Sequence, residues 1–306
     1  MNDNTPFEQI IQKIDPQSKL LRAWKLKGGV SAQVTALELV RPDGQRQKMI
    51  VRQHGPAELK RNPHSAADES RLLQLVHTAG LPAPQPYYLD QSGEIFPTPY
   101  LVIEYIEGQS EFAPTNLPDY IRQFATHLSR IHQLDGAQPA LSFLPRQEQK
   151  YAEKLKARSA ILDESLNERR VRDTLEALWP LPQRNPPTLL HGDFWPGNLL
   201  WQQGQLVAII DWEDAAIGDP LTDLANSRLE LLWAFGPEAM HHFTSLYQSL
   251  TALDFTDLPC WDLCAALRHI DQIGSWGVDE ATERTMRERL GWFIGQAMER
   301  LPDHEF

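Results

Sequence analysis

Residues 189–201 read LLHGDFWPGNLLW, and residues 209–213 read IIDWE. Three polar residues stand at fixed offsets inside these apolar segments: Asp193, Asn198 five positions later, and Asp211 thirteen positions beyond that. Taken singly, they have ordinary structural interpretations as a turn former, a cap and the start of a helix. Those interpretations leave the combined spacing to chance, so we interpret the three residues as parts of one functional site.

The local structure predicted around these residues supports that interpretation. Pro196 and Gly197 interrupt the first segment, so we expect a loop there and no helix. Residues 199–201 and 206–210 are apolar and flank the short turn 202–205, which predicts a β-hairpin. A hairpin can bring the loop before its first strand close to the residue after its second strand. We therefore expect the three polar side chains to lie near one another.

The residue types suit phosphoryl transfer. A kinase catalytic loop has the order D-x-x-x-x-N and is followed by a metal-binding Asp. In that chemistry one carboxylate orients the acceptor hydroxyl and takes its proton, while an amide oxygen and a second carboxylate hold Mg²⁺ against the phosphates. We predict Asp193 as the catalytic residue, and Asn198 and Asp211 as the Mg²⁺ ligands.

With these motifs the chain resembles the aminoglycoside phosphotransferase and choline kinase-like family of small-molecule kinases. The family's H-G-D-x-x-x-x-N and I-D-W/F-E segments are matched at residues 191–198 and 210–213, and its G-D-P-x-x-D-L-A segment at residues 218–225. The resemblance implies an α+β, protein-kinase-like fold of two lobes. It also implies ATP-dependent phosphorylation of a hydroxyl group on a small molecule.

We accordingly expect two lobes with different compositions of helix and strand. Residues 1–106 should form the N-terminal nucleotide-binding lobe, an antiparallel sheet with one main helix, and residues 107–306 a mostly helical lobe for catalysis and acceptor binding. In the second lobe, apolar residues recur at helical spacing in the segments 117–134, 147–166, 168–179, 221–235, 238–253, 259–276 and 279–301.

A glycine-rich turn joins the first two predicted strands, residues 20–27 and 33–40. Gly28, Gly29 and Ser31 lie in this turn, where backbone N–H groups can approach phosphate oxygens without a side chain in the way. Two glycines between strands usually mark only a hairpin. Their place ahead of the catalytic loop favours nucleotide binding.

The strand predicted at residues 47–53 carries the cation that we expect to bind phosphate. A protein kinase has Lys at the matching position, whereas this chain has Arg52, with Lys48 on the same strand face as the alternative. The partner of this cation should be a helix carboxylate. Glu69 shares one face of the helix predicted at residues 65–79 with apolar residues, so we expect it to pair with Arg52.

The apolar strand at residues 99–108 ends at a glycine. In the family that the chain resembles, this strand leads into the linker between the lobes, where backbone groups bind adenine. By that resemblance the carbonyl of Glu104 and the N–H of Ile106 would bind the base. The sequence leaves open whether ATP or GTP is preferred.

The acceptor is the least constrained part of the site. Three residues adjoin the predicted catalytic residues and are candidates for its pocket: Trp195, Trp212 and Glu213. Acidic residues converge at the motifs and the formal net charge is −12, so we expect a small hydroxyl-bearing acceptor that is cationic rather than anionic. A pocket lined by Arg228 or Arg268 would overturn that expectation. The identity of the acceptor and the oligomeric state stay open.

Composition limits the other classes of function. No run of about 18 apolar residues exists and the N-terminus lacks a basic and apolar signal, so we expect a cytoplasmic protein without a membrane partner. The absence of a basic cluster disfavours a nucleic-acid partner. Cys260 and Cys264 lie one helical turn apart without further residues to complete a zinc site, so we expect reduced core thiols.

Two alternatives use the same fold. A non-catalytic nucleotide-binding module would not need Asp193, Asn198 and Asp211 together. A protein-substrate kinase is disfavoured because Gly192 replaces the Arg of H-R-D, residues 212–213 replace Phe-Gly, and no A-P-E follows. The motifs therefore favour an ATP- and Mg²⁺-dependent kinase of a small molecule.

Overall fold

The structure is a computed structural model, and it describes residues 4–26, 32–159 and 161–301. The chain divides into two compact units, the first formed by Met1–Gly108 with Val207–Ile210 and the second by Gln109–Leu206 with Asp211–Phe306. The boundary predicted after Ile106 lies two residues before the division after Gly108.

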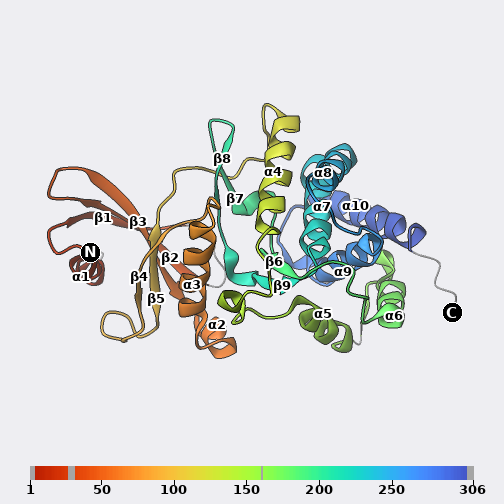
Figure 1. Cartoon of the computed structure of the whole chain (residues 1–306), viewed down its shortest axis with the longest axis horizontal. Coiled ribbons are helices and arrows are strands. Elements are labelled where there is room, and N and C mark those ends of the chain that lie inside the picture. The colour runs from red at the N-terminus through yellow and green to blue at the C-terminus, as the bar shows by residue number, and fades with distance from the viewer. Residues whose placement is uncertain (1–3, 27–31, 160, 302–306) are drawn as a thin grey trace. The chain divides into compact units, whose positions relative to one another are not determined.

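The first unit is built on a five-stranded antiparallel sheet in the order β1-β2-β3-β5-β4 (Figure 1). Arg52 lies on the central strand, opposite Val34 on one side and Leu101 on the other. The antiparallel sheet is the one that the sequence predicts. Its strands are β1 (Lys19–Lys25), β2 (Ala32–Val40), β3 (Arg46–His54), β4 (Pro86–Asp90) and β5 (Tyr100–Glu104).

Two helices cover opposite faces of this sheet. Ile10 of α1 packs in one buried cluster with Val51 of β3. Arg52 is the next residue and points to the other face, because successive strand side chains alternate. There it meets Glu69 of α3, so α3 is fixed on the face that carries the cation. The helices of this unit are α1 (Thr5–Ile14), α2 (Pro56–Arg61) and α3 (Ser65–Thr78).

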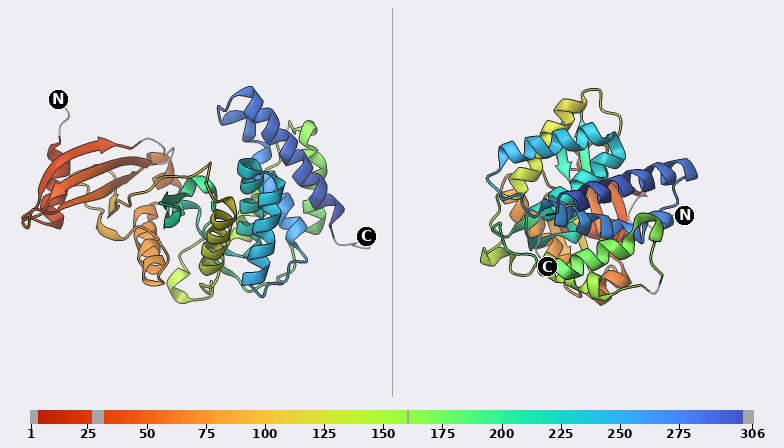
Figure 2. Two further views of the ribbon diagram at one scale, coloured as in Figure 1. Left: turned by 90° about the horizontal axis from the view of Figure 1, so that it is seen from above. Right: turned by 90° about the vertical axis from the view of Figure 1, so that its right-hand side faces the viewer.

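The second unit is mostly helical, as predicted. Its buried helix α7 packs against α8, α9 and α10 (Figure 2). Cys260 and Cys264 are free and buried, as expected. None of the helices in the described part of the chain has the length and apolar character that crossing a membrane requires. The helices are α4 (Leu117–Ile131), α5 (Gln147–Lys156), α6 (Glu168–Leu178), α7 (Leu221–Phe235), α8 (Pro237–Leu250), α9 (Leu258–Ile270) and α10 (Glu280–Glu299).

Short strands position the loops between these helices. β6 (Thr188–Leu190) pairs antiparallel with β9 (Ala216–Gly218), with Leu190 opposite Ala216. The start of the loop that leaves β6 therefore lies beside the end of the loop that enters β9. β7 (Leu199–Gln202) and β8 (Gln205–Ile209) form a separate two-stranded sheet, which is the hairpin predicted from the sequence.

Several local predictions are wrong, among them the helix predicted at residues 259–276, which ends at Ile270. The helix predicted at residues 147–166 ends at Lys156. The prediction was too long because Ile161 fits the apolar pattern, although it is 86% exposed. The loop after Asp193 contains a 3₁₀ turn, Pro196–Asn198, where we expected no helix. A proline at the first position of a single turn blocks no intrahelical hydrogen bond, so the turn can form.

Candidate active site

The loop that carries Asp193 is anchored by a buried carboxylate. Asp223, in the first turn of α7, accepts hydrogen bonds from the backbone N–H groups of His191 (2.7 Å) and Gly192 (3.0 Å). Its Oδ2 also lies 3.3 Å from Nε2 of His132. Burial alone would raise the pKa of Asp223, but the hydrogen bond with His132 and the other polar partners hold it below its ordinary value. Asp223 therefore stays charged and fixes the backbone of the loop.

Gly192 is required by both conformation and space. Its φ is +81°, and a Cβ at this position would lie 2.2 Å from the carbonyl oxygen of Asp214. A residue with a side chain would be strained in this backbone region and would collide with the neighbouring loop. The close approach brings the Asp214 loop directly against the loop that carries Asp193.

Asp193 and Asn198 lie together, as the motif spacing predicts. Nδ2 of Asn198 donates to the backbone carbonyl and to Oδ2 of Asp193, each at 3.0 Å. The backbone N–H of Asp193 donates to Nδ1 of His191 at 3.2 Å. Residues of the same loop therefore hold the carboxylate of Asp193, through Asn198, and its backbone N–H, through His191.

Arg268 of α9 contacts this carboxylate with its guanidinium. Its Nη2 donates to Oδ1 of Asp193 at 3.0 Å and to Oδ2 of Asp214 at 3.1 Å, and its Nη1 donates to the carbonyl of Gly192. Burial raises the pKa of Asp193 above its ordinary value, and the Arg268 guanidinium opposes that rise. A raised pKa makes a carboxylate a better proton acceptor than an exposed one.

A second carboxyl group near Asp193 is neutralised by its surroundings. Burial raises the pKa of Glu230 to about 8, and the charge of Asp193 adds to that rise. Oε1 of Glu230 lies 3.7 Å from Nε2 of His269, whose pKa burial lowers. At neutral pH most Glu230 is therefore protonated, and His269 is uncharged.

Asp211 has a backbone conformation that non-glycine residues rarely adopt. Its φ and ψ are 64° and 63°, in the left-handed region, two residues after β8 ends at Ile209. Such conformations are held by surrounding structure and are concentrated at functional sites. Asn198 donates to Asp193 through its Nδ2, so its amide oxygen is the atom suited to a cation.

These oxygen donors suit Mg²⁺. Amide and carboxylate oxygens are its preferred protein ligands, and it commonly takes only one or two of them together with phosphate oxygens. Among the described residues, no group of three or more His, Cys, Asp and Glu side chains is placed to hold a metal ion. A cation at Asn198 and Asp211 would therefore need oxygens from a bound nucleotide or water.

The first unit contains the predicted ion pair between Arg52 and Glu69. Nε of Arg52 lies 3.2 Å from Oε2 of Glu69, and their side chains are 12% and 10% exposed. This confirms the pairing predicted from the strand and helix faces. The alternative cation, Lys48, pairs with Glu107 and lies over the ring of Tyr105, with Nζ 5.2 Å from the ring centroid.

His54 was not predicted and completes this network. Its Nε2 lies 3.1 Å from the same Glu69 oxygen, and its Nδ1 lies 2.9 Å from Oε1 of Glu58. Burial disfavours the charged imidazole, but hydrogen bonds and charges from the two carboxylates outweigh burial and raise the pKa of His54 to about 9. Glu69 is therefore shared between two buried cations at neutral pH.

The structure says less about the other residues predicted to bind the nucleotide. Gly28, Gly29 and Ser31 lie outside the described residues. Glu104 is the last residue of β5, and its backbone N–H donates to the carbonyl of Gln85 at 2.8 Å. Ile106 follows two residues later. The adenine-binding role of Glu104 and Ile106 stays a prediction.

A cavity of about 310 Å³ opens beside the loop that carries Asp193, with Gly192, Asp214 and Arg268 in its lining. The predicted acceptor residues Trp195, Trp212 and Glu213 are described, but none of them lines this cavity. Trp212 is buried, 2% exposed, with its ring centroid 4.6 Å from that of His191. Trp195 packs against Phe112 at 6.1 Å between centroids, and Glu213 is exposed. Their acceptor role stays a prediction.

The comparisons with known proteins agree with these motifs. The sequence profile described as "Phosphotransferase enzyme family" matches residues 25–257. The chain is 28% identical over 199 residues to acyl-CoA dehydrogenase family member 10 of Mus musculus, covering 60% of this chain and 18% of that protein. It is 23% identical over 265 residues to family member 11 of Homo sapiens, covering 74% of this chain and 33% of that protein. The chain therefore spans a third or less of the length of these two relatives.

Solved structures show the same fold. A macrolide 2′-phosphotransferase from Brachybacterium faecium superposes with a TM-score of 0.64 at 16% identity, covering 95% of this chain and 98% of that one. A thermostable mutant of the aminoglycoside phosphotransferase APH(4)-Ia, in complex with AMP-PNP and hygromycin B, gives 0.63 at 17% identity with the same coverage. The profile match covers more than half of the 306 residues, and we conclude that the chain belongs to the phosphotransferase enzyme family.

Proposed function

We propose that the protein transfers the γ-phosphate of ATP to a hydroxyl group of a small molecule, with Mg²⁺ as its cofactor. The environment of Asp193 is the observation that carries this proposal. Its loop is fixed by Asp223, its carboxylate accepts from Asn198, and burial raises its pKa. A positioned carboxylate of this kind suits the removal of a proton from an acceptor hydroxyl.

The proposed reaction is a single displacement. The acceptor oxygen forms a bond to the γ-phosphorus as its proton passes to Asp193, and the bond from the γ-phosphorus to the bridging oxygen breaks, which releases ADP. Asn198 and Asp211 would hold Mg²⁺, which supplies charge neutralisation at the phosphates when bound. Asp193 must be ionised to accept the proton, so the rate should fall at low pH.

The first unit contributes the nucleotide-binding residues. Arg52 would bind phosphate oxygens, and Glu69 would orient its guanidinium, because their ion pair is buried. Gly28, Gly29 and Ser31 would approach the phosphates through the backbone, and Glu104 with Ile106 would bind the base. The nucleotide-binding roles of these residues stay predictions.

The related structures support a nucleotide and a small acceptor. One contains AMP-PNP and hygromycin B, and another is described as a complex with GDP and kanamycin. Both acceptors are small molecules. Because both adenine and guanine nucleotides occur among these structures, the preference for ATP is tested by comparing it with GTP.

The test replaces Asp193 by Asn. We expect the rate of ADP release to fall about 10²–10⁴-fold, the usual contribution of a general base, while affinity for AMP-PNP with Mg²⁺ stays nearly unchanged. Asp173→Asn, which removes an exposed carboxylate on α6, is the matched control and should keep the wild-type rate. Retention of the wild-type rate in Asp193→Asn would contradict the proposal. Nucleotide binding by the wild type without turnover across hydroxylated acceptors would favour the non-catalytic alternative.

A further inference from the structure

The cavity beside the catalytic loop is rich in cations. Lys150 and Lys154 of α5 and Arg268 of α9 line it. Nη2 of Arg268 lies 3.0 Å from Oδ1 of Asp193, so the cavity begins one side chain away from the proposed proton acceptor. Its volume, about 310 Å³, falls at the small end of the range for ligand pockets.

Cationic side chains outnumber acidic ones among the described residues that line the cavity. Asp214 is the one acidic side chain among the described lining residues, and Arg268 shares its guanidinium between Asp214 and Asp193. Lys150 donates to the backbone carbonyl of Asp214 at 3.2 Å. Nζ of Lys154 lies 3.4 Å from Asp271, whose side chain is 47% exposed, so water weakens that attraction.

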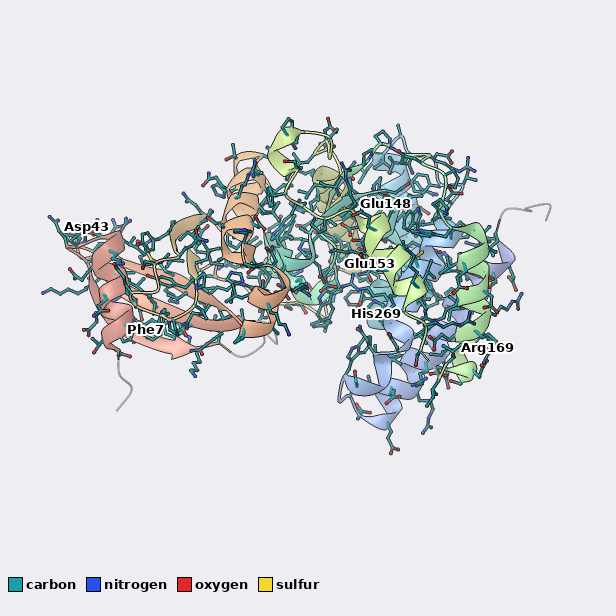
Figure 3. The ribbon with its side chains drawn as sticks, turned by 90° about the horizontal axis from the view of Figure 1, so that it is seen from below. Phe7, Asp43, Glu148, Glu153, Arg169 and His269 are labelled. Atoms are coloured by element: carbon teal, nitrogen blue, oxygen red, sulfur yellow. The ribbon has the colours of Figure 1, made fainter. Side chains whose placement is uncertain are left out.

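The two lysines occupy one face of α5. They are four residues apart, so their side chains are neighbours on the helix, and like charges at this spacing repel each other. Glu148 and Glu153 of the same helix, labelled in Figure 3, do not line the cavity. Glu148 accepts the backbone N–H of Asp219 at 3.3 Å, and Glu153 is exposed. A bound anion would relieve the repulsion between the lysines.

Neutral polar groups in the lining also suit an anion. Tyr151 is 5% exposed, and burial raises the pKa of its hydroxyl, which therefore remains a hydrogen-bond donor at neutral pH. Gln147 and Gln272 add amide groups. Together with the three cations, these groups can donate hydrogen bonds from several directions.

We propose that this cavity binds an anionic group of the acceptor, a carboxylate or a phosphate, while the acceptor's hydroxyl faces Asp193. This proposal rests on the phosphotransferase function proposed above. It reverses the expectation of a cationic acceptor, because Arg268 already compensates the charge of Asp193 and a polycation would face three cations. The sequence predicts an anionic acceptor where Arg268 lines the pocket, and Arg268 lines this cavity.

The experiment measures binding of a matched series of three-carbon alcohols by calorimetry, in the presence of AMP-PNP and Mg²⁺. The series is glycerol, 3-amino-1,2-propanediol, glycerate and glycerol 3-phosphate. We expect glycerate or glycerol 3-phosphate to bind more tightly than the neutral and cationic members, and their relative affinity distinguishes a carboxylate site from a phosphate site. Added salt should weaken this binding, because it screens the attraction.

The double variant Lys150→Gln/Lys154→Gln tests the site itself. The affinity for the preferred anion should fall about tenfold or more, which corresponds to about 1.4 kcal/mol. Lys156→Gln, which changes an exposed lysine of the same helix, is the matched control and should bind like the wild type. If the double variant does not fold, as judged by circular dichroism, Lys154→Gln alone should show the same direction of change.

Three results would overturn the proposal. The first is tighter binding of 3-amino-1,2-propanediol than of either anion. The second is unchanged anion affinity in folded variants that lack the lysines. The third is no binding of either anion by the wild type at millimolar concentration. The function itself is tested separately by ADP release in Asp193→Asn, so anion binding without phosphoryl transfer would contradict the phosphotransferase proposal while the basic site stood.

Discussion

The two units hold their principal arginines in different ways. In the first unit, Arg52 faces a carboxylate that is itself bonded to His54, and all three side chains are almost fully buried. In the second unit, Arg268 is divided between Asp193, Asp214 and the carbonyl of Gly192, and it borders a cavity.

This difference separates two uses of a guanidinium. A buried network in which each cation is paired with a carboxylate, here called closed, fixes one side-chain geometry. That suits a residue that must bind in the same orientation in every catalytic cycle. Arg268 contacts a carboxylate and borders a cavity at the same time, so a ligand in that cavity could also reach its guanidinium. This arginine can therefore tune a neighbouring carboxylate and contribute to acceptor binding. The following predictions test whether the two networks behave in these separate ways.

The largest expected effect is on the closed network. Glu69→Ala leaves Arg52 and protonated His54 buried without their shared carboxylate. Breaking a buried pair of this kind costs about 3–5 kcal/mol, so we expect a loss of that size in the free energy of unfolding of the first unit, measured with urea. Glu94→Ala, which breaks an exposed pair with Lys13, should cost less than about 1 kcal/mol. Equal effects of the two variants would show that the network is not closed.

A smaller effect concerns pH. The pKa of His54 is raised from an ordinary 6.5 to about 9, and its side chain is fully buried. The stabilisation is therefore complete below about pH 6.5 and is lost as the pH rises through 9. We expect the free energy of unfolding to fall by about 1–3 kcal/mol across this interval. In His54→Gln this dependence should disappear, and its persistence would assign the effect to another group.

The smallest effect is expected at the open network. Arg268→Gln removes the cation that opposes the rise in the pKa of Asp193. Because the base works in its ionised form, the acid limb of the pH–rate profile should move to higher pH, by about one unit or less. Arg289→Gln is a control on α10, where the guanidinium binds backbone carbonyls of residues 232 and 233. An unchanged acid limb in Arg268→Gln would separate Arg268 from the ionisation of Asp193.

The sequence predicts the site best where the information is local. The contact between Asp193 and Asn198 follows from a five-residue spacing inside one loop. The pairing of Arg52 with Glu69 was predicted by applying the kinase pattern of a strand cation to residues 47–53 and pairing it with a carboxylate on the helix at residues 65–79. Side-chain alternation and helical periodicity indicated which faces could meet. The structure confirms this pairing.

The missed residues depend on contacts between distant segments. We considered Arg268 only as a possible lining residue of the acceptor pocket. Its contact with Asp193 was missed because it spans 75 positions and comes from a helix that carries no motif. His54 was overlooked because it ends a strand whose pattern already accounts for Arg52, and Glu58 lies in a short helix that the sequence did not indicate. The packing of α1 was missed for a related reason, because its apolar face has meaning only against the sheet. Tertiary placement, not local propensity, decides all three.

Gly192 has a consequence for attempts to change acceptor specificity. A protein kinase places an arginine immediately before its catalytic aspartate. Here that position must remain glycine. The guanidinium near the aspartate comes instead from Arg268 of α9, which donates to the carbonyl of Gly192. On the proposed function, Arg268 would therefore connect the choice of acceptor to the pKa of Asp193. A mutant library that randomises the cavity should keep Gly192 and Arg268 constant and vary α5, where acceptor preference can change without altering the base.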